Sequence, residues 1–455
     1  MSGPGRPSAW SGERAERHLR SLELFGMRFG LDRMRRMMTA LRSPERRFDS
    51  IHVLGTNGKT STTRMTAAIL QRHGLRTGSY TSPHLVSYTE RVQVAERDLS
   101  MGAFAAAVAR AAWAAERVNR TLAADDHVTQ FELLTAAAFW ELAERGVEVA
   151  VIEAGLGGRY DATSVIDPRV TVLTNVGLEH TRWLGPTVAD IAAEKLAVVR
   201  PAGTLALGAD LHPDALAVAR EVAREREARI LQVGASGHEG AVRETLGRDG
   251  PPAPQATPEW DTAEPLLARG DFQRRNFALA RLAAGAHLAA TGIEESPEAV
   301  AQAARSTAVS GRMEILPGEP LTVLDGAHNP DAALALARSL PGVLGGRPLG
   351  LVLGVLEDKD AAGILGTLLP LCERAWFTAP PGARALPPPA LLSLARQQGF
   401  EEALCEPDPV LALRAARAWA SDRDGAVLAT GSVYLVGELL GSVEGLDLAR
   451  EGVRP

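Results

Sequence analysis

Residues 50–61 read SIHVLGTNGKTS, an apolar run that meets a glycine-rich turn. Ser50–Gly55 has the composition of a buried strand, and Thr60–His73 has the periodicity of a helix that ends at Gly74. A strand, a glycine turn and a helix in this order direct backbone N–H groups and the positive helix end to one point. A triphosphate fits that point, so the stretch predicts a phosphate-binding loop.

The turn supplies six candidate nucleotide ligands: Thr56, Asn57, Gly58, Lys59, Thr60 and Ser61. We expect Lys59 to reach the β- and γ-phosphates of ATP, and the hydroxyl of Thr60 or Ser61 to help position Mg²⁺. Only two residues separate Gly55 from Gly58, so the loop departs from the common GxxxxGK[ST] pattern. The alternative interpretation is a glycine-rich turn with a surface lysine.

Strands alternate with helices along most of the chain. Buried strands are expected at 147–153 and 170–175, and helices at 32–41, 101–120, 130–145, 187–199 and 272–291. A second alternation, with strands near 321–325, 350–355, 375–378 and 426–430, indicates a further domain. We expect an α/β protein: a P-loop ATPase domain with a mostly parallel sheet over 1–305, then a smaller Rossmann-like α/β domain over 306–455.

Two segments are expected to lack regular structure. Residues 1–20 carry Arg, Glu, Pro and Gly without an apolar core, which is typical of a frayed N-terminal arm. Residues 234–270 are rich in Gly, Pro, Ser and Asp, which favours a surface excursion.

Composition excludes several classes of protein. The chain has 455 residues, 45% hydrophobic and 23% charged, which excludes intrinsically disordered and fibrous proteins. A formal charge of -6 gives no electrostatic reason to expect nucleic acid or an anionic membrane as a partner, and no stretch approaches the ~20 apolar residues of a membrane span. Cys372 and Cys405 are too few for a disulfide framework. We expect a soluble, cytoplasmic protein.

A carboxylate stands where an open α/β sheet places its ligand crevice. Glu153 ends a Val-Ile strand, and the glycines that follow permit close backbone approach. A carboxylate at that point suits Mg²⁺, which prefers oxygen ligands and keeps several waters. By residue type alone, His180 is more often a hydrogen-bonding residue and Ser82 a turn hydroxyl. Lys195 is then a lysine that snorkels or pairs with its glutamate neighbour.

The flanks of the loop resemble the dihydrofolate synthase/folylpolyglutamate synthase branch of the ATP-dependent Mur ligase superfamily, which has the same short loop. Nine blocks agree in order over roughly residues 25–440. They are GTNGKTS at Gly55–Ser61, TSPHL and YTERV within Thr81–Val92, EAGLGGRYDAT at Glu153–Thr163, GLEHT at Gly177–Thr181, EK at Glu194–Lys195, FQRRN at Phe272–Asn276, GRME at Gly311–Glu314, DGAHNP at Asp325–Pro330 and TGSVYLVGE at Thr430–Glu438.

The resemblance implies a magnesium ligand set of Ser82, Glu153 and His180. It also implies that Lys195 is N-carboxylated and that its carbamate supplies a negative group near the metal. Lys59, His180 and Lys195 are then the expected catalytic residues. A second Mg²⁺ or a monovalent cation is compatible with the resemblance. The sequence EKLAV replaces the usual EKAGI here, so local packing around Lys195 differs.

Four further residues match family positions at the nucleotide. The resemblance implies ATP contacts from Asn276, Arg312 and Asp325, and His328 of the DGAHNP block is expected to face the same cleft. Without the resemblance, an amide cap, a surface ion pair and a turn-forming aspartate are equally good interpretations of the first three. Phe272 replaces the more usual histidine, so no imidazole role carries over to this position.

Two segments match the part of the family that holds a pterin: Thr129, Gln130 and Phe131, and Tyr160, Asp161 and Ala162. A flat heteroaromatic ring needs a stacking face and paired donors and acceptors, which Phe131 and Asp161 could supply. Ordinary core packing of Phe131 is the alternative.

Together these expectations describe an ATP-dependent ligase. It would phosphorylate an acceptor carboxylate and then displace phosphate with the amine of L-glutamate. The acceptor would be dihydropteroate, a reduced folate or both, and a monomer is expected. Closure of the two domains would bring Asp325 to the nucleotide and exclude water from the acyl phosphate.

Two other functions are weighed against this one. A Mur-type peptidoglycan ligase would need a nucleotide-sugar domain, and too little chain precedes Gly55 to form it. A non-catalytic, ATP-gated binding module would not need Lys59, Glu153 and His180 together.

Overall fold

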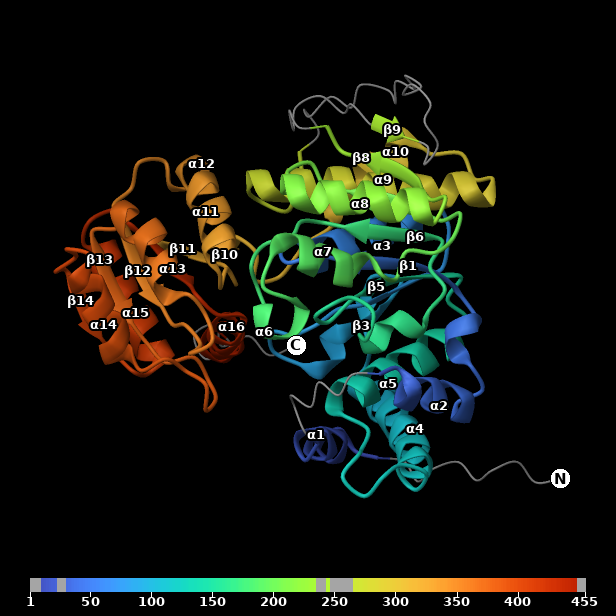
Figure 1. Cartoon of the computed structure of the whole chain (residues 1–455). Coiled ribbons are helices and arrows are strands. Elements are labelled where there is room, and N and C mark those ends of the chain that lie inside the picture. The colour runs from blue at the N-terminus through green and yellow to red at the C-terminus, as the bar shows by residue number, and fades with distance from the viewer. Residues whose placement is uncertain (1–9, 23–29, 235–242, 246–264, 448–455) are drawn as a thin grey trace. The chain divides into compact units, whose positions relative to one another are not determined.

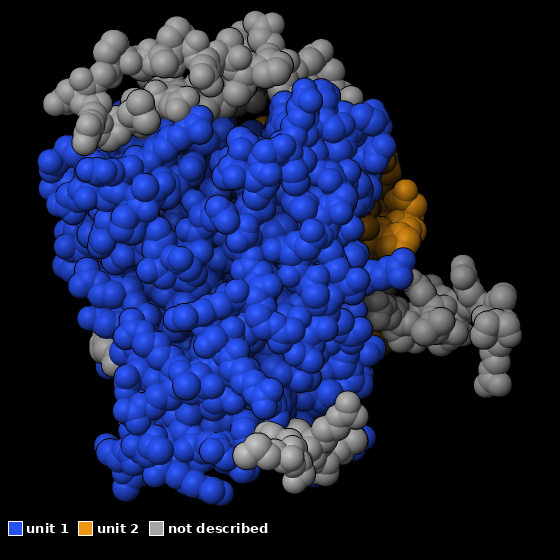
Figure 2. Space-filling model, turned by 90° about the vertical axis from the view of Figure 1, so that its right-hand side faces the viewer, with its two compact units in different colours: residues 1–265, 275–307 blue, residues 266–274, 308–455 orange. Residues whose placement is uncertain are grey.

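The computed structural model describes residues 10–22, 30–234, 243–245 and 265–447 (Figure 1). The chain forms two compact units, which Figure 2 colours separately. Unit 1 comprises residues 1–265 and 275–307, and unit 2 comprises residues 266–274 and 308–455. Each unit is built around one mostly parallel sheet, so the expected α/β fold class is confirmed.

Within the described residues, the sheet of unit 1 has nine strands in the order β4-β3-β2-β5-β1-β6-β7-β8-β9. They are β1 (Asp49–Leu54), β2 (Thr77–Tyr80), β3 (Val92–Val94), β4 (Arg97–Asp98), β5 (Val149–Glu153), β6 (Val170–Leu173), β7 (Thr204–Leu207), β8 (Arg229–Gln232) and β9 (Arg243–Thr245). Strands β2, β5, β1, β6, β7 and β8 are parallel, whereas β3, β4 and β9 are antiparallel to their neighbours.

The register of the central strands brings three carboxyl ends to one edge of the sheet. Val53 of β1 lies beside Glu153 of β5, and Leu54 lies beside Leu173 of β6. Because an open α/β sheet binds its ligands outside such an edge, the register places the phosphate loop and Glu153 where a ligand site is expected.

The helices of unit 1 are α1 (Gly12–Arg20), α2 (Asp32–Ala40), α3 (Lys59–Arg72), α4 (Met101–Asn119), α5 (Gln130–Glu144), α6 (Thr181–Leu184), α7 (Val188–Leu196), α8 (Pro213–Glu225), α9 (Asp271–Thr291, whose first turn belongs to unit 2) and α10 (Pro297–Ser306). Short 3₁₀-helices span Pro44–Arg46, Tyr88–Arg91 and Ala162–Val165. Helices α4 and α5 pack with Ala150 and Ile152 of β5 in one apolar cluster. Helices α7 and α8 pack with Leu173 and Leu205 in another.

The expectation of a frayed arm over residues 1–20 is wrong for its second half. Residues Gly12–Arg20 form α1, which begins where the Ser11 side chain accepts a hydrogen bond from the Arg14 backbone. Ala15 and Leu19, four residues apart, are fully buried in the same cluster as α4. Two apolar residues on one side of a short, highly charged helix were too weak a pattern to predict it. Residues 1–9 lie outside the described residues.

The expected surface excursion over 234–270 falls largely outside the described residues. Its described parts are Gly234, strand β9 at the edge of the sheet, and the segment from Pro265 onward.

The sheet of unit 2 has six strands within the described residues, in the order β10-β11-β15-β12-β13-β14. They are β10 (Glu314–Leu316), β11 (Leu321–Leu324), β12 (Leu349–Leu353), β13 (Arg374–Phe377), β14 (Ala403–Cys405) and β15 (Ala426–Thr430); only β10 is antiparallel to its neighbour. The helices are α11 (Pro330–Ser339), α12 (Pro341–Leu344), α13 (Ala361–Leu368), α14 (Pro388–Gln397), α15 (Pro409–Ser421) and α16 (Val433–Asp447), with a 3₁₀-helix at Leu369–Leu371. Leu351, Phe377 and Leu428 are fully buried in the core of this unit.

None of the helices in the described part of the chain combines the length and the apolar character needed to cross a membrane.

Candidate active site

The glycine-rich loop that is predicted to bind phosphate lies between β1 and α3, so the expected order of strand, turn and helix is confirmed. The geometry of the loop requires both of its glycines. Gly55 has a φ of 144° and Gly58 a φ of 81°. A Cβ atom on Gly55 would lie 1.8 Å from Oγ1 of Thr174, and one on Gly58 would lie 2.5 Å from Oδ1 of Asn276. Asn276, a predicted nucleotide contact on α9, therefore reaches the loop itself.

Three hydrogen bonds donated by backbone N–H groups hold the loop against the chain that follows β6. The amide N–H of Thr56 donates to the carbonyl of Asn175 (3.0 Å), and that of Asn57 donates to Oδ1 of the same asparagine (2.8 Å). The hydroxyl of Thr56 accepts from the N–H of Gly177 at 3.0 Å. The segment that leads to His180 is thus fastened to the phosphate loop.

Two lysines converge on the loop. Nζ of Lys59 donates to the carbonyls of Gly55 and Thr56, at 3.1 and 3.0 Å. Nζ of Lys195, on α7, donates to the carbonyl of Gly55 at 3.2 Å and to that of Leu156 at 2.6 Å. Burial, together with the charge of Lys59, lowers the pKa of Lys195 to about 7. A substantial fraction of this buried amine is therefore neutral near pH 7.

Glu153 lies at the end of β5 with only 2% of its surface exposed. The hydroxyl of Thr60 donates to both carboxylate oxygens, at 3.0 and 2.9 Å, and the backbone N–H of Ser82 donates to Oε2 at 3.2 Å. Ser61, one residue further along α3, is buried. The Glu153 carboxylate and the Thr60 hydroxyl are hard oxygen groups, the type that Mg²⁺ prefers.

His180 adopts a left-handed backbone conformation, with a φ of 56°, immediately before α6. Across the described residues, no three His, Cys, Asp or Glu side chains come together in a way that could hold a metal ion. A cation at Glu153 would therefore need ligands besides clustered carboxylate, imidazole or thiol groups, such as hydroxyls, water or phosphate oxygens.

A second group of predicted residues meets at Gly155. A Cβ atom there would lie 2.7 Å from Cζ of Phe131 and 3.2 Å from Oδ2 of Asp161, so the aromatic ring and the carboxylate are neighbours. Oδ2 of Asp161 accepts a hydrogen bond from the N–H of Gly157 at 2.9 Å. Next to Asp161 in the chain, Tyr160 is exposed and Ala162 is buried.

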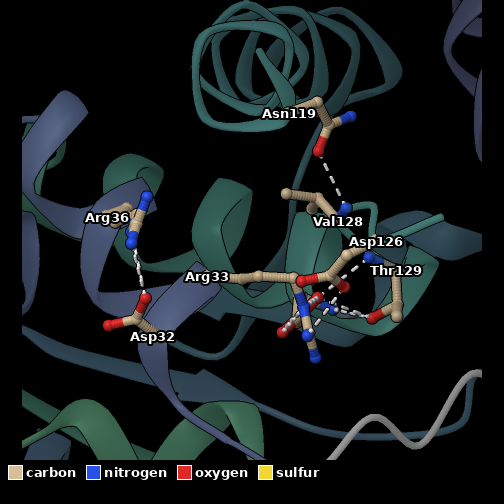
Figure 3. A network of polar contacts seen from close by, with 8 residues as sticks. Asp32, Arg33, Arg36, Asn119, Asp126, Val128 and Thr129 are labelled. Carbon is tan, nitrogen blue, oxygen red and sulfur yellow. Dashed lines mark hydrogen bonds and ion pairs between the residues drawn. The ribbon is translucent and has the colours of Figure 1, made fainter. Parts of the chain in front are cut away.

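The side chains of Thr129 and Gln130 form hydrogen bonds with other residues of unit 1. Thr129 caps α5: its hydroxyl accepts from the N–H of Glu132 (3.3 Å), and its own N–H donates to the Glu132 carboxylate (2.9 Å). Nε of Arg33 donates to the same carboxylate at 3.0 Å, and Nη1 of Arg33 binds Asp126; Figure 3 shows this network. The amide of Gln130 donates to the Leu19 carbonyl of α1. These contacts fix the start of α5, from which Phe131 projects.

The ion pair between Arg33 and Glu132 was not predicted from the sequence, although a local pattern marks Glu132. Thr129 and Glu132 have the spacing of a capping box, S/T-x-x-E, just before an apolar helix. No local pattern indicates that Arg33, 99 residues away, completes the network.

Three predicted residues of unit 2 share one corner of that unit, where β11 ends. Asp325 is 3% exposed and accepts from the N–H groups of Met313 and Ala327, at 2.9 and 2.8 Å. Burial raises the pKa of Asp325, and the nearby Arg312 opposes that shift. A Cβ atom on Gly326 would lie 2.3 Å from Nη1 of Arg312, and Nδ1 of His328 hydrogen-bonds to the Gly326 carbonyl at 2.8 Å.

Comparison with known proteins decides the family. Two family models match the chain: the Mur ligase middle domain over residues 53–248, and the Mur ligase glutamate ligase domain over residues 311–433. A folylpolyglutamate synthase of Lacticaseibacillus casei is 34% identical over 368 residues, 78% of this chain and 82% of that protein. A dihydrofolate synthase/folylpolyglutamate synthase of Bacillus subtilis is 31% identical over 424 residues, 91% and 95% of the two proteins. The chain belongs to the dihydrofolate synthase/folylpolyglutamate synthase family.

A solved structure agrees with this assignment. The folylpolyglutamate synthase of Mycobacterium tuberculosis complexed with ADP matches with a TM-score of 0.83 and 29% identity, over 98% of this chain and 99% of that one. The chain spans about half the length of two relatives, from Halobacterium salinarum and Haloferax volcanii, that are named "probable bifunctional folylpolyglutamate synthase/dihydropteroate synthase". The resemblance inferred from nine sequence blocks is confirmed, and this member of the dihydrofolate synthase/folylpolyglutamate synthase family is a ligase.

Proposed function

We propose that this chain uses ATP to join L-glutamate to dihydropteroate and to reduced folates through an acyl phosphate. The observation that carries the proposal is that Lys59 and Lys195 both donate to the carbonyl of Gly55 at the start of the glycine loop, while Glu153 accepts from Thr60 at its end. A loop that only terminated a strand would not need two lysines on one carbonyl and a buried carboxylate bound to the first turn of the next helix.

The loop from Thr56 to Ser61 would bind the phosphates of ATP. Its backbone N–H groups and the start of α3 supply positive potential, and Lys59 would exchange its two loop carbonyls for phosphate oxygens. Ser82, Glu153 and His180 would hold Mg²⁺, with the hydroxyl of Thr60 as a hydrogen-bond donor beside it. A bound Mg²⁺ neutralises charge that develops on phosphate oxygens during transfer.

Lys195 would act as a carbamate. Its neutral amine attacks the carbon of carbon dioxide, an N–C bond forms while one C=O π bond opens onto oxygen, and the nitrogen releases one proton, so the neutral amine becomes an anionic carbamate. The lowered pKa near 7 supplies the neutral amine that this addition requires. A negative oxygen group beside Gly55 and Leu156 would then help to orient the cation of the nucleotide.

The reaction needs positioning more than a nucleophilic side chain. A carboxylate oxygen of the acceptor attacks the γ-phosphorus of ATP, and ADP leaves. The amine of glutamate then attacks the acyl carbon, phosphate leaves with its bonding electrons, and the amine loses a proton. The protein contributes alignment and charge neutralisation, for which Lys59 in unit 1 and Arg312 in unit 2 are suited. Asn276, Asp325 and His328 would complete the nucleotide contacts.

Phe131 and Asp161 would hold the pterin part of the acceptor, which supports activity on dihydropteroate as well as on folates. The ring of Phe131 offers an apolar face, and the carboxylate of Asp161 would accept from a ring N–H group. Thr129 and Gln130 would contribute by fixing the start of α5, with Tyr160 and Ala162 flanking the carboxylate. We further propose that the protein works in the cytoplasm as a monomer.

Product mass spectrometry tests the proposal. The protein is incubated with ATP, Mg²⁺ and L-glutamate, with dihydropteroate in one reaction and tetrahydrofolate in another. We expect both acceptors to gain the mass of one glutamyl residue, with stoichiometric ADP. A third reaction contains a UDP-muramoyl acceptor, and turnover confined to it would instead identify a peptidoglycan ligase. No acceptor-dependent ADP release in any reaction would leave only a binding module.

A further inference from the structure

A buried chain of hydrogen bonds runs from β1 to the proposed acceptor site. His52 lies on β1 with no exposed surface, and its Nε2 is 2.9 Å from Oγ1 of Thr163. Oγ1 of Thr163 is in turn 2.5 Å from Oδ1 of Asp161. The register pairs His52 with Ile152, so His52 faces the side of the sheet on which Ile152 packs with α5.

The direction of each hydrogen bond follows from the donors available. A carboxylate only accepts, so the Thr163 hydroxyl gives its one proton to Asp161. That hydroxyl must then accept from His52, which places the ring proton on Nε2. Two observations agree: Nδ1 of His52 has no hydrogen-bond partner in the described part of the chain, and burial lowers the pKa of His52 to about 4, which keeps the ring neutral.

These hydrogen bonds determine which oxygen of Asp161 remains available to a ligand. Oδ1 accepts from both the N–H (3.0 Å) and the hydroxyl of Thr163, which fills its two acceptor positions. Oδ2 accepts from the N–H of Gly157 and retains one position. Oδ2 is also the oxygen next to Gly155 and Phe131.

We propose that His52 is a positioning residue for the acceptor. By fixing the Thr163 hydroxyl, it locks the carboxylate of Asp161 so that Oδ2 offers one acceptor position to an N–H group of a heteroaromatic ring. His52 acts through Thr163 and does not contact the acceptor. This inference rests on the function proposed above, because it assigns Asp161 to the acceptor.

Four variants separate positioning from core packing. His52→Phe removes the ring N–H but keeps a ring, His52→Gln keeps a donor near the position of Nε2, and Thr163→Val removes the hydroxyl with little change in shape. His287→Phe is the matched control, because His287 is also buried (2% exposed), also has an Nδ1 without a partner in the described residues, and lies on α9.

Binding and kinetics are measured for each variant with dihydropteroate, ATP and glutamate. We expect His52→Phe to raise Kd and KM for dihydropteroate about tenfold, the usual effect of losing one hydrogen bond, with kcat changed by less than about twofold. The KM values for ATP and glutamate should not change. His52→Gln should restore most of the affinity, and His52→Phe combined with Thr163→Val should be no worse than either alone.

Three results with the variants would overturn the inference. They are an unchanged affinity for dihydropteroate in His52→Phe and Thr163→Val, a parallel rise in the KM of all three substrates, or additive effects in the double variant. A loss of thermal stability alone, as expected for His287→Phe, would mean that His52 only packs in the core. Direct measurement of dihydropteroate binding distinguishes failure of this inference from failure of the proposed ligase activity. Binding that weakens in the variants supports this inference even if wild-type turnover fails, and absence of wild-type binding contradicts it.

Discussion

Lys59 and Lys195 donate hydrogen bonds to the same carbonyl oxygen, that of Gly55, at N···O distances of 3.1 and 3.2 Å. One lysine begins the helix after the loop, and the other comes from α7, more than a hundred residues later. Lys195 is the buried member of the pair, and desolvation is the first cause of its low pKa, with the charge of Lys59 second. The phosphate loop and Lys195 are therefore coupled electrostatically.

We expect Lys195→Met to raise the thermal stability of the nucleotide-free protein and to abolish ligation. Folding lowers the pKa of Lys195 from 10.5 to about 7, so between these pH values the unfolded chain binds more protons than the folded one. Wild-type stability from this group therefore rises with pH across that window, and the cost of the buried charge is fully present below it.

The gain in Tm from Lys195→Met should accordingly be larger at about pH 6 than at about pH 9, in bicarbonate-free buffer. Differential scanning calorimetry at the two pH values measures it. An equal gain in Tm at the two pH values would show that folding does not lower the pKa of Lys195.

Lys59→Ala should abolish turnover and leave the fold intact. The ammonium of Lys59 hydrogen-bonds only to the carbonyls of Gly55 and Thr56 among the described residues, so its loss removes little of the packing. Loss of a group that stabilises transferring phosphate typically lowers kcat by ~10² or more. Coupled ADP release measures the rate and circular dichroism checks the fold; substantial remaining activity would mean that the triphosphate binds elsewhere.

Thr60→Val should raise the Mg²⁺ concentration needed for half-maximal activity about tenfold, because it removes the donor that holds both oxygens of Glu153. Thr63→Val is the matched control on the same helix. Thr63 is fully buried, and its hydroxyl has no hydrogen-bond partner in the part of the chain described. When activity is titrated with Mg²⁺, the half-maximal concentration should rise for Thr60→Val only. An equal rise for both variants would show that Thr60 has no specific role in binding the cation.

Gly58→Ala should weaken nucleotide binding and destabilise unit 1 by about 1–3 kcal/mol, since it combines a φ of 81° with a Cβ atom 2.5 Å from Oδ1 of Asn276. Gly102→Ala, near the start of α4, provides the comparison. Apart from its chain neighbours and the backbone of its own helix, no atom lies within 4 Å of its added Cβ, so Gly102→Ala should stabilise the protein by about 0.5–1 kcal/mol. Urea denaturation and ADP titration of both variants test this, and a neutral Gly58→Ala would contradict the described loop geometry.

Much of the fold followed from short-range patterns. The strand, turn and helix around Gly55 could be predicted because the apolar period and the glycines lie in consecutive residues. The neighbourhood of Glu153 followed from a general rule, since parallel strands bring their carboxyl ends to one edge. Helix α1 could not be predicted, because its stability depends on burying Ala15 and Leu19 against a helix some ninety residues away in the chain.

The contacts that orient the site residues were beyond sequence reasoning. His52 and Thr163 are 111 residues apart, and nothing local to either residue marks it as a hydrogen-bond partner of the other. The same holds for Arg33, whose guanidinium fixes the start of α5 from another helix. Residue types and periodicity predict which elements form, whereas side-chain partners across elements depend on tertiary packing.

In the proposed function, the loop from Gly55 to Ser61 binds the phosphates of ATP, and all other site assignments depend on this position of the nucleotide. A crystal structure of the protein with a non-hydrolysable ATP analogue and Mg²⁺ tests it directly. We predict that the phosphates accept hydrogen bonds from the backbone of residues 57–60, and that Nζ of Lys59 has moved from the Gly55 and Thr56 carbonyls to a phosphate oxygen. Phosphates bound elsewhere, with Lys59 still on both carbonyls, would contradict the account.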